Sequence, residues 1–232
     1  MIADTIDARL LSCADLVRAG AVLADIGTDH GYLPIFLLER GRISRAVLSD
    51  VNEGPLKKAR ENVEAAGLGS SCELVLTDGA SALAPFSATD YTICGMGGEL
   101  IADIIDEAPH LCDPDIRLIL QPMSRQGHLR SYLYSHGFDI LEERYSFDNG
   151  KYYVCMLAKF VGREKTQDTV TLELGPSLDH ADDADAYVGF LERKRSSLLR
   201  TVEGKHRGGN TAEAEEALLA AIEERINKQK GK

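Results

Sequence analysis

The sequence predicts an α/β protein with a mostly parallel sheet, an antiparallel strand hairpin at its end and a helical hairpin after it. Short apolar runs alternate with amphipathic stretches from residue 21 to residue 135, the pattern of a parallel sheet covered by helices on both faces. Two extended runs follow with no helix between them, so they must pair antiparallel. The last segment carries two apolar stripes at helical spacing.

The elements are predicted in order along the chain. Ile6, Leu10 and Val17 follow helical spacing, and Gly20 ends this first helix. The apolar runs predict strands at residues 21–27, 45–50, 72–77, 91–95 and 116–121. The helices between them are predicted at residues 34–40, 55–66, 98–107 and 125–135.

The last two strands are predicted at residues 139–147 and 151–160, joined by Asp148-Asn149-Gly150. Asn and Gly accept the positive φ angles that a tight hairpin turn requires. A dinucleotide-binding Rossmann fold usually ends in a sixth parallel strand, whereas the class I methyltransferase fold ends in such a hairpin. We therefore expect a seven-stranded sheet of the class I methyltransferase type, Rossmann-like, over residues 1–160.

Residues 161–185 are polar and acidic and are predicted to be a linker. Residues 186–232 are predicted to form a helical hairpin similar to a short coiled coil. Its apolar stripes are Tyr187, Leu191, Leu198 and Val202 on one helix, and Leu218, Leu219, Ile222 and Ile226 on the other. Asn210, with Glu213 three residues later, is the expected capping pair of the second helix.

The bulk composition is that of a globular protein: 232 residues, 44% of them hydrophobic, with a net charge of −11. The longest apolar runs fall far short of the ~20 residues of a membrane span. The acidic start of the chain does not resemble a signal peptide, so we expect a cytoplasmic protein. The five cysteines lack metal-ligand spacing, so we expect reduced thiols and no metal site.

The charge is unevenly distributed. Residues 1–158 hold 13 Lys or Arg and 23 Asp or Glu, whereas residues 186–211 hold six Lys or Arg and only two Glu. The six cations are Arg193, Lys194, Arg195, Arg200, Lys205 and Arg207. This basic segment is a candidate for phosphate contacts. The alternative is a dimerisation hairpin with solvated charges, so the oligomeric state stays open between a monomer and a weak homodimer.

Acids and glycines lie at the C-terminal ends of four successive predicted strands, at the sheet edge where open α/β proteins bind their ligands. They are Asp25 and Gly27, Asp50 and Val51, Asp78 and Gly79, and Gly95, Met96 and Gly97.

Each of these groups suits part of a nucleotide-type cofactor. The Asp50 carboxylate suits the two ribose hydroxyls, because it is an acceptor that can bridge two donors. Asp78 suits an adenine amino group, and the glycines let the backbone approach the ligand. NAD and S-adenosylmethionine both fit such a site. The acid Asp25 before Gly27, and Asp29 at the middle glycine position of GxGxxG, favour S-adenosylmethionine.

These motifs together resemble the bacterial tRNA (adenine-22-N1)-methyltransferase family. The resemblance spans nearly the whole chain. It rests on the segments 25–34, 51–55, 78–79, 95–98, 120–122 and 175–178 and on the closing helical hairpin. It implies transfer of a methyl group from S-adenosylmethionine to N1 of an adenosine in tRNA, with the basic hairpin as the RNA-binding part.

The segment after the fourth strand agrees with a ring nitrogen as the target. Enzymes that methylate exocyclic amines often carry Asn/Asp-Pro-Pro-Tyr/Phe there, whereas this chain has Gly95-Met96-Gly97-Gly98. A ring nitrogen already offers a lone pair, so the protein mainly positions the reactants.

The product of N1 methylation is cationic, so a nearby carboxylate would stabilise it. Asp29 is the candidate, with His30 or Tyr32 stacking on or hydrogen-bonding to the base. The alternative for Asp29 is a helix cap. Gln121 and Met123 are further candidates for the base pocket, and Met123 fits the core equally well.

Two other functions stay open on the residues alone. One is a small-molecule methyltransferase with the same cofactor site, in which the helical hairpin is a lid or a dimer contact. The other is a non-catalytic protein that has kept a cofactor pocket.

Overall fold

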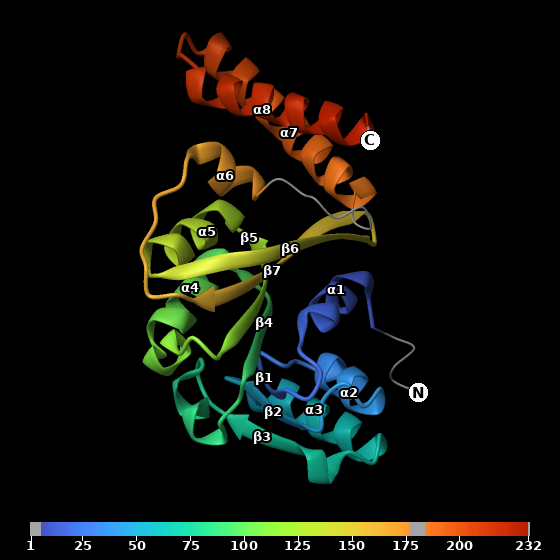
Figure 1. Ribbon diagram of the computed structural model, residues 1–232. Helices are drawn as coiled ribbons and strands as arrows, with labels where there is room; N and C mark the ends of the chain where they lie inside the picture. Colours follow the sequence, from blue (N-terminus) through green and yellow to red (C-terminus); the bar gives the residue numbers. More distant parts are fainter. Residues whose placement is uncertain (1–5, 177–183, 232) are drawn as a thin grey trace.

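The computed structural model describes residues 6–176 and 184–231 (Figure 1). Most of the acidic part of the predicted linker, and the second half of the 175–178 motif, lie outside these residues. So does the acidic start of the chain at residues 1–5.

Seven strands form one sheet in the order β3-β2-β1-β4-β5-β7-β6. The strands are β1 (Val22–Ile26), β2 (Arg45–Asp50), β3 (Cys72–Leu76), β4 (Asp90–Gly97), β5 (Arg117–Ser124), β6 (Phe138–Asp148) and β7 (Lys151–Phe160). Strands β1 to β5 are parallel, and β7 pairs antiparallel with both β5 and β6. This arrangement confirms the predicted class I methyltransferase fold, including its terminal hairpin.

The predicted helices are present with shifts of a few residues at their ends. They are α1 (Ala8–Leu16), α2 (Tyr32–Glu39), α3 (Glu53–Ala65), α4 (Gly98–Asp106), α5 (Gln126–Ser135), α7 (Ala184–Arg207) and α8 (Glu213–Lys230). The predicted capping pair is wrong: α8 follows Ala212 without a side-chain cap, and Asn210 donates to the carbonyl oxygen of Gly208 at 3.5 Å.

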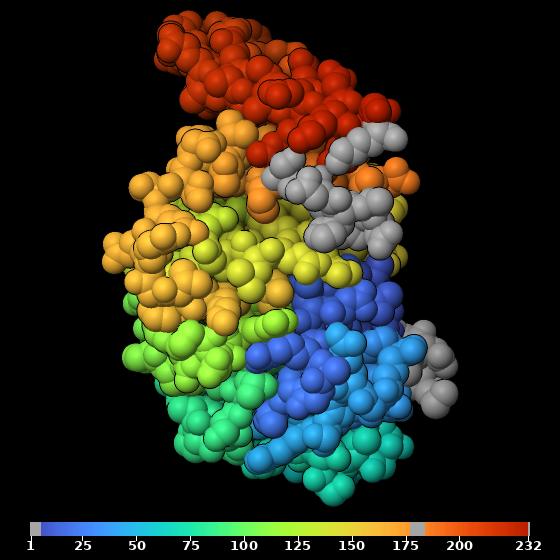
Figure 2. Space-filling view, viewed as in Figure 1, coloured from blue at the N-terminus to red at the C-terminus, as the bar shows by residue number. Residues whose placement is uncertain are grey.

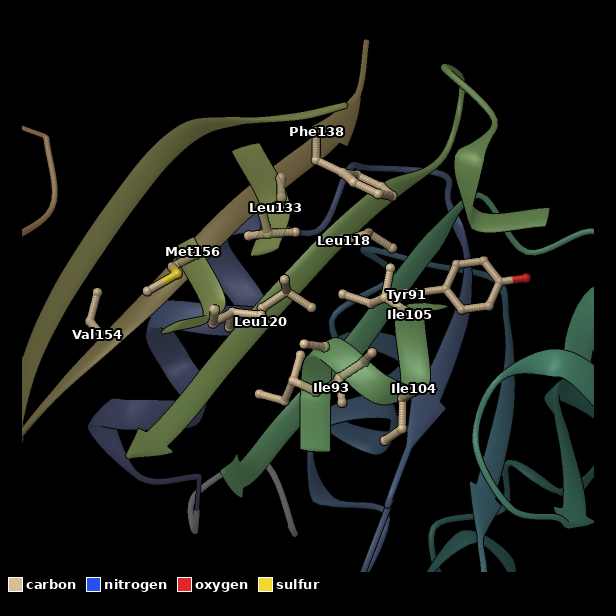
Figure 3. Close-up of a cluster of buried hydrophobic side chains, with 14 of the residues drawn as sticks. Tyr91, Ile93, Ile104, Ile105, Leu118, Leu120, Leu133, Phe138, Val154 and Met156 are labelled. Carbon is tan, nitrogen blue, oxygen red and sulfur yellow. The ribbon is translucent and has the colours of Figure 1, made fainter. Parts of the chain in front are cut away.

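A hydrophobic core fills each face of the sheet. On one face, side chains of β4, β5 and β7 pack against α4 and α5, and Tyr91, Leu118 and Met156 are among the buried side chains (Figure 3). On the other face, β1 and β2 pack against α1, α2 and α3. Burying these apolar surfaces is the main stabilising contribution to the fold.

Residues 161–185 were predicted to be a linker, but they contain a short helix, α6 (Thr169–Leu174). The Asp168 carboxylate caps its first turn by accepting from the amide of Thr171 at 2.9 Å. Gly175 ends the helix with a φ of 77°. Six residues are too few to show a helical period in the sequence.

The C-terminal helices share a core with the sheet. Leu174, Tyr187 and Leu191 are buried in the same cluster as the side chains of β6 and β7. The two long helices project beyond this contact, above the rest of the molecule (Figure 2). Arg225 of α8 donates to the carbonyl oxygen of Gly175 at 2.7 Å and to the Tyr187 hydroxyl at 2.9 Å. The hairpin is therefore fixed at its base.

A buried ion pair lies beneath the joint, that is, the contact between the C-terminal helices and the sheet. Arg130 of α5 donates to both carboxylate oxygens of Glu143 of β6, at 2.6 and 2.9 Å, and to the carbonyl oxygen of Leu172 at 2.7 Å. The Tyr145 hydroxyl donates to the same carboxylate at 2.7 Å. Burial disfavours the charged form of Arg130, but the Glu143 carboxylate outweighs it and raises the pKa of Arg130 above its ordinary value.

No helix in the described part of the chain combines the length and the hydropathy needed to cross a membrane.

Candidate active site

A cavity of about 760 Å³ opens at the carboxyl edge of the parallel strands. Twelve of the residues that the sequence singled out line it. They are Asp25, Gly27, Asp29, His30, Tyr32, Asp50, Val51, Asp78, Gly79, Gly95, Met96 and Met123. The structure thus brings the cofactor candidates and the catalytic candidates into one site. Gly97 lies outside the described lining, where it precedes α4 and approaches the Ser124 side chain.

Asp25 is the buried acid at the end of β1. Its two carboxylate oxygens accept from the hydroxyls of Thr28 and Thr92, both at 2.6 Å. These bonds hold the carboxylate at the cavity wall and tie the β1–α2 turn to β4. Burial raises the pKa of Asp25 to about 6, although the two hydroxyls oppose this shift.

The raised pKa predicts a pH-dependent stability difference between the parent and Asp25→Asn. The native state binds the proton more tightly than the unfolded chain, so the stability contributed by Asp25 falls as the pH rises from about 4 to about 6. Between pH 3.5 and 7 the free energy of unfolding of Asp25→Asn should improve relative to the parent by about 2–3 kcal/mol. Denaturant unfolding at both pH values measures this difference, and a constant difference would contradict it.

Two glycines that line the cavity lie where the ends of β1 and β4 approach each other closely. Gly27 has a φ of 69°, and a Cβ atom there would lie 2.2 Å from Cε of Met96. Gly95 has a φ of 79° at a bulge in β4, so the strand continues to Gly97 rather than ending at residue 95 as expected. Side chains at these two positions would displace the neighbouring loop or strain the backbone.

Asp29, His30 and Tyr32 lie together at the start of α2. The Asp29 carboxylate is 3.4 Å from Nε2 of His30, and the His30 and Tyr32 rings stack with their centroids 5.3 Å apart. The helix-cap alternative for Asp29 is wrong, because α2 begins after Gly31 and has no side-chain cap. Asp29 itself has a φ of 50° and a side chain that is 69% exposed. Its carboxylate is therefore available to a ligand.

Arg9 of α1 is the main residue of the site that the sequence did not reveal. Its guanidinium donates to Oε1 of Gln121 at 2.9 Å and to the Asp7 carboxylate at 3.2 Å, and lies 5.9 Å from the centroid of the Tyr153 ring. Gln121, expected in the base pocket, is instead fully buried. Its amide oxygen also accepts from the backbone amide of Gly95 at 3.0 Å, so Gln121 positions Arg9 and Gly95.

The β6–β7 turn is a second part of the site that was not expected from the sequence. Asp148, Asn149 and Tyr153 line the cavity, because the hairpin strands are longer than the parallel strands and pass the carboxyl end of β5. In the sequence, the signal for this long hairpin was the predicted length of its two strands, nine and ten residues.

The charges of the cavity favour a cationic ligand with one anionic group. Six aspartates contribute to the described lining: Asp7, Asp25, Asp29, Asp50, Asp78 and Asp148. Arg9 is the one Lys or Arg among the described lining residues. The volume is within the usual range for small-molecule sites. Across residues 6–176 and 184–231, no three His, Cys, Asp or Glu side chains are grouped to bind a metal ion.

The six basic residues of the hairpin differ in their surroundings. Lys194 is only 21% exposed and binds the Glu173 carboxylate at 2.6 Å, and burial lowers its pKa although Glu173 opposes this. Lys205 pairs with Glu215 at 2.7 Å. Arg193, Arg200 and Arg207 are exposed and follow one another at intervals of seven residues, so they share one side of α7. Arg195 is half-buried on a neighbouring side.

Comparison with known proteins identifies methyltransferases as relatives of this chain. The family model described as "Methyltransferase domain" matches residues 6–156. The chain is 32% identical over 193 residues to the tRNA (adenine(22)-N(1))-methyltransferase of Bacillus subtilis, covering 83% of this chain and 81% of that protein.

Two solved structures share the fold over almost the whole chain. Streptococcus pneumoniae Sp1610 in complex with S-adenosyl-L-methionine is 32% identical, with a TM-score of 0.81 over 95% of this chain and 99% of the other. The m1A22 tRNA methyltransferase TrmK of B. subtilis is 27% identical, with a TM-score of 0.76 over 97% of each chain. The chain therefore belongs to the tRNA (adenine(22)-N(1))-methyltransferase family.

Proposed function

We propose that this protein transfers the methyl group of S-adenosylmethionine to N1 of adenosine 22 in tRNA, in the cytoplasm. The observation that carries the proposal is that Asp50 and Asp78, the acids suited to a nucleoside, line the same cavity as Asp29, His30 and Tyr32. S-adenosylmethionine supplies an electrophilic methyl group on a sulfonium centre. The cavity suits this cofactor, because its acids favour the sulfonium and ammonium cations and its glycines leave the backbone open.

The cofactor-binding roles follow from the donor and acceptor types. Asp50 accepts from the ribose hydroxyls, beside the exposed Val51. Asp78 and Gly79 face the adenine, and Asp25 and Gly95 hold the amino group. Arg9 binds the carboxylate of the methionine part. Gln121 and Asp7 hold its guanidinium beside β5, and β1 and β4 separate β5 from β2 and β3, whose ends carry Asp50 and Asp78.

The substrate-binding roles centre on the start of α2. The His30–Tyr32 stack offers an aromatic surface for the target adenine. The N1 lone pair attacks the methyl carbon while the carbon–sulfur bond breaks and its electron pair goes to sulfur. The adenine gains a positive charge in this step. The Asp29 carboxylate stabilises that developing charge.

Methyl transfer tests the proposal directly. The protein is incubated with S-adenosylmethionine and unmodified tRNA transcripts that carry adenosine or guanosine at position 22, and the digested nucleosides are analysed by mass spectrometry. We expect 1-methyladenosine in the first transcript and none in the second. Methylation of small molecules but not of tRNA would favour the small-molecule alternative, and no transfer at all would favour a non-catalytic protein.

RNA binding by α7 gives a second prediction. Replacing Arg193, Arg200 and Arg207 by alanine should weaken tRNA binding and lower the slope of log affinity against log salt by about 0.7–0.9 for each phosphate that the protein no longer neutralises. The charge-matched control is Lys57, Lys58 and Arg60 of α3 changed to alanine. Gel-shift titrations at several salt concentrations measure both. Equal slopes in the two variants, with altered self-association of the arginine variant, would support the dimerisation alternative.

A further inference from the structure

The β6–β7 turn links the cavity to the exposed arginines of α7. Its Asp148 and Asn149 line the cavity. On its other side, the carbonyl oxygen of Gly150 accepts from Nη1 of Arg193 at 3.3 Å. The turn therefore adjoins both the cavity and Arg193, and a chain of nucleotides that contacts both lies close to it.

The turn is held in place by close packing against α7. Gly189 is buried in α7, and a Cβ atom there would lie 2.3 Å from the ring of Tyr152. Tyr152 faces Phe147 across the hairpin, with the ring centroids 4.7 Å apart at 42°. The position of Phe147 is thus fixed relative to both the cavity and α7.

Phe147 is a large apolar side chain left 52% exposed at this place. Tyr145 lies two residues earlier on the same face of β6 and is buried beneath Tyr187 and Phe190 of α7. The side chains of α7 that bury Tyr145 do not bury Phe147. Phe147 and its partner Tyr152 are on the α7 face of the hairpin, and the cavity-lining Tyr153 is on the other face. An exposed aromatic ring beside the turn that Arg193 contacts is suited to stack on a nucleic acid base.

We propose that Phe147 stacks on an unpaired base of the tRNA next to the target adenosine. This contact rests on the proposed function, because it concerns the same substrate. An adenosine that leaves the RNA stack to enter the cavity deprives its neighbour of a stacking partner. The Phe147 ring replaces that partner beside the β6–β7 turn, and Arg193 lies next to the same turn for the adjoining phosphate.

The absence of tryptophan from the sequence provides a direct reporter. Phe147→Trp places one indole at the proposed contact. Leu141→Trp is the matched control, since Leu141 is 51% exposed on the same strand near its other end. On titration with tRNA we expect quenching of Phe147→Trp fluorescence and lower accessibility to acrylamide. The Leu141→Trp signal should not change.

Kinetics provide the second measurement. Phe147→Ala should raise the KM for tRNA about tenfold with little change in cofactor affinity, and Phe147→Trp should restore the parent value. Leu141→Ala should behave like the parent. The proposal is overturned if the parent methylates tRNA while the Phe147 variants match the Leu141 variants in both assays. Failure of the parent to methylate any tRNA would overturn the proposed function, and the stacking interaction with it.

Discussion

Asp29→Asn is expected to lower kcat for tRNA methylation about 100-fold, because it removes the carboxylate nearest to the charge that develops on the adenine. Asparagine is the appropriate substitution. It keeps the size of the side chain and tolerates the φ of 50° at this position, which alanine does less well. Steady-state kinetics with saturating cofactor and tRNA measure the effect.

Calorimetry with S-adenosylmethionine separates catalysis from binding in this variant. Its Kd should stay within about threefold of the parent value, since Asp29 is assigned no bond to the cofactor. Glu64→Gln, which removes an exposed carboxylate outside the cavity lining, is the control and should retain parent kinetics. A variant that methylates tRNA at the parent rate would show that Asp29 has no catalytic role.

Arg130→Met is expected to lower the free energy of unfolding by about 3–5 kcal/mol, because it leaves the buried Glu143 carboxylate without its cationic partner. Arg130→Met with Glu143→Gln should recover part of this stability, since the uncompensated charge is then gone. Lys58→Met removes an exposed pair with Glu61 and should change stability by less than about 1 kcal/mol. Denaturant unfolding measures all three variants.

The arrangement of this joint also predicts which function the Arg130 variant loses. Arg130 holds the carbonyl oxygen of Leu172, and Arg225 holds that of Gly175, so α6 and the helical hairpin share these hydrogen bonds. Removal of the ion pair should therefore impair tRNA binding more than cofactor binding at temperatures where the protein remains folded. If cofactor affinity falls by the same factor as tRNA affinity, the ion pair does not stabilise the position of the hairpin specifically.

The sheet was predictable from the sequence because its strands are short apolar runs with clear ends. The run at residues 45–50 matches β2 at both ends, and the Asn149-Gly150 turn indicated the terminal hairpin correctly. Helix α6 was not predictable in this way. Its position depends on hydrogen bonds from Arg130 and Lys194, which are distant in sequence.

The candidate site was predictable where a residue lies at the C-terminal end of a strand, as Asp25 and Asp50 do. Arg9 lies in a helix before the sheet, and only the fold brings it beside Gln121, 112 residues later. Lys194 shows a second limit: its charge suggested RNA binding, and the sequence did not indicate its ion pair with Glu173. Sequence alone gives the sign of a charge but not its partner.

The central claim is methylation of N1 of adenosine 22, and a tRNA that lacks only this atom tests it most directly. Two tRNAs are prepared that differ at position 22, one with adenosine and one with 1-deazaadenosine. We predict that both bind with similar affinity, that the first takes up one labelled methyl group from S-adenosylmethionine, and that the second takes up none. Label in the 1-deazaadenosine tRNA at the same rate would contradict this claim.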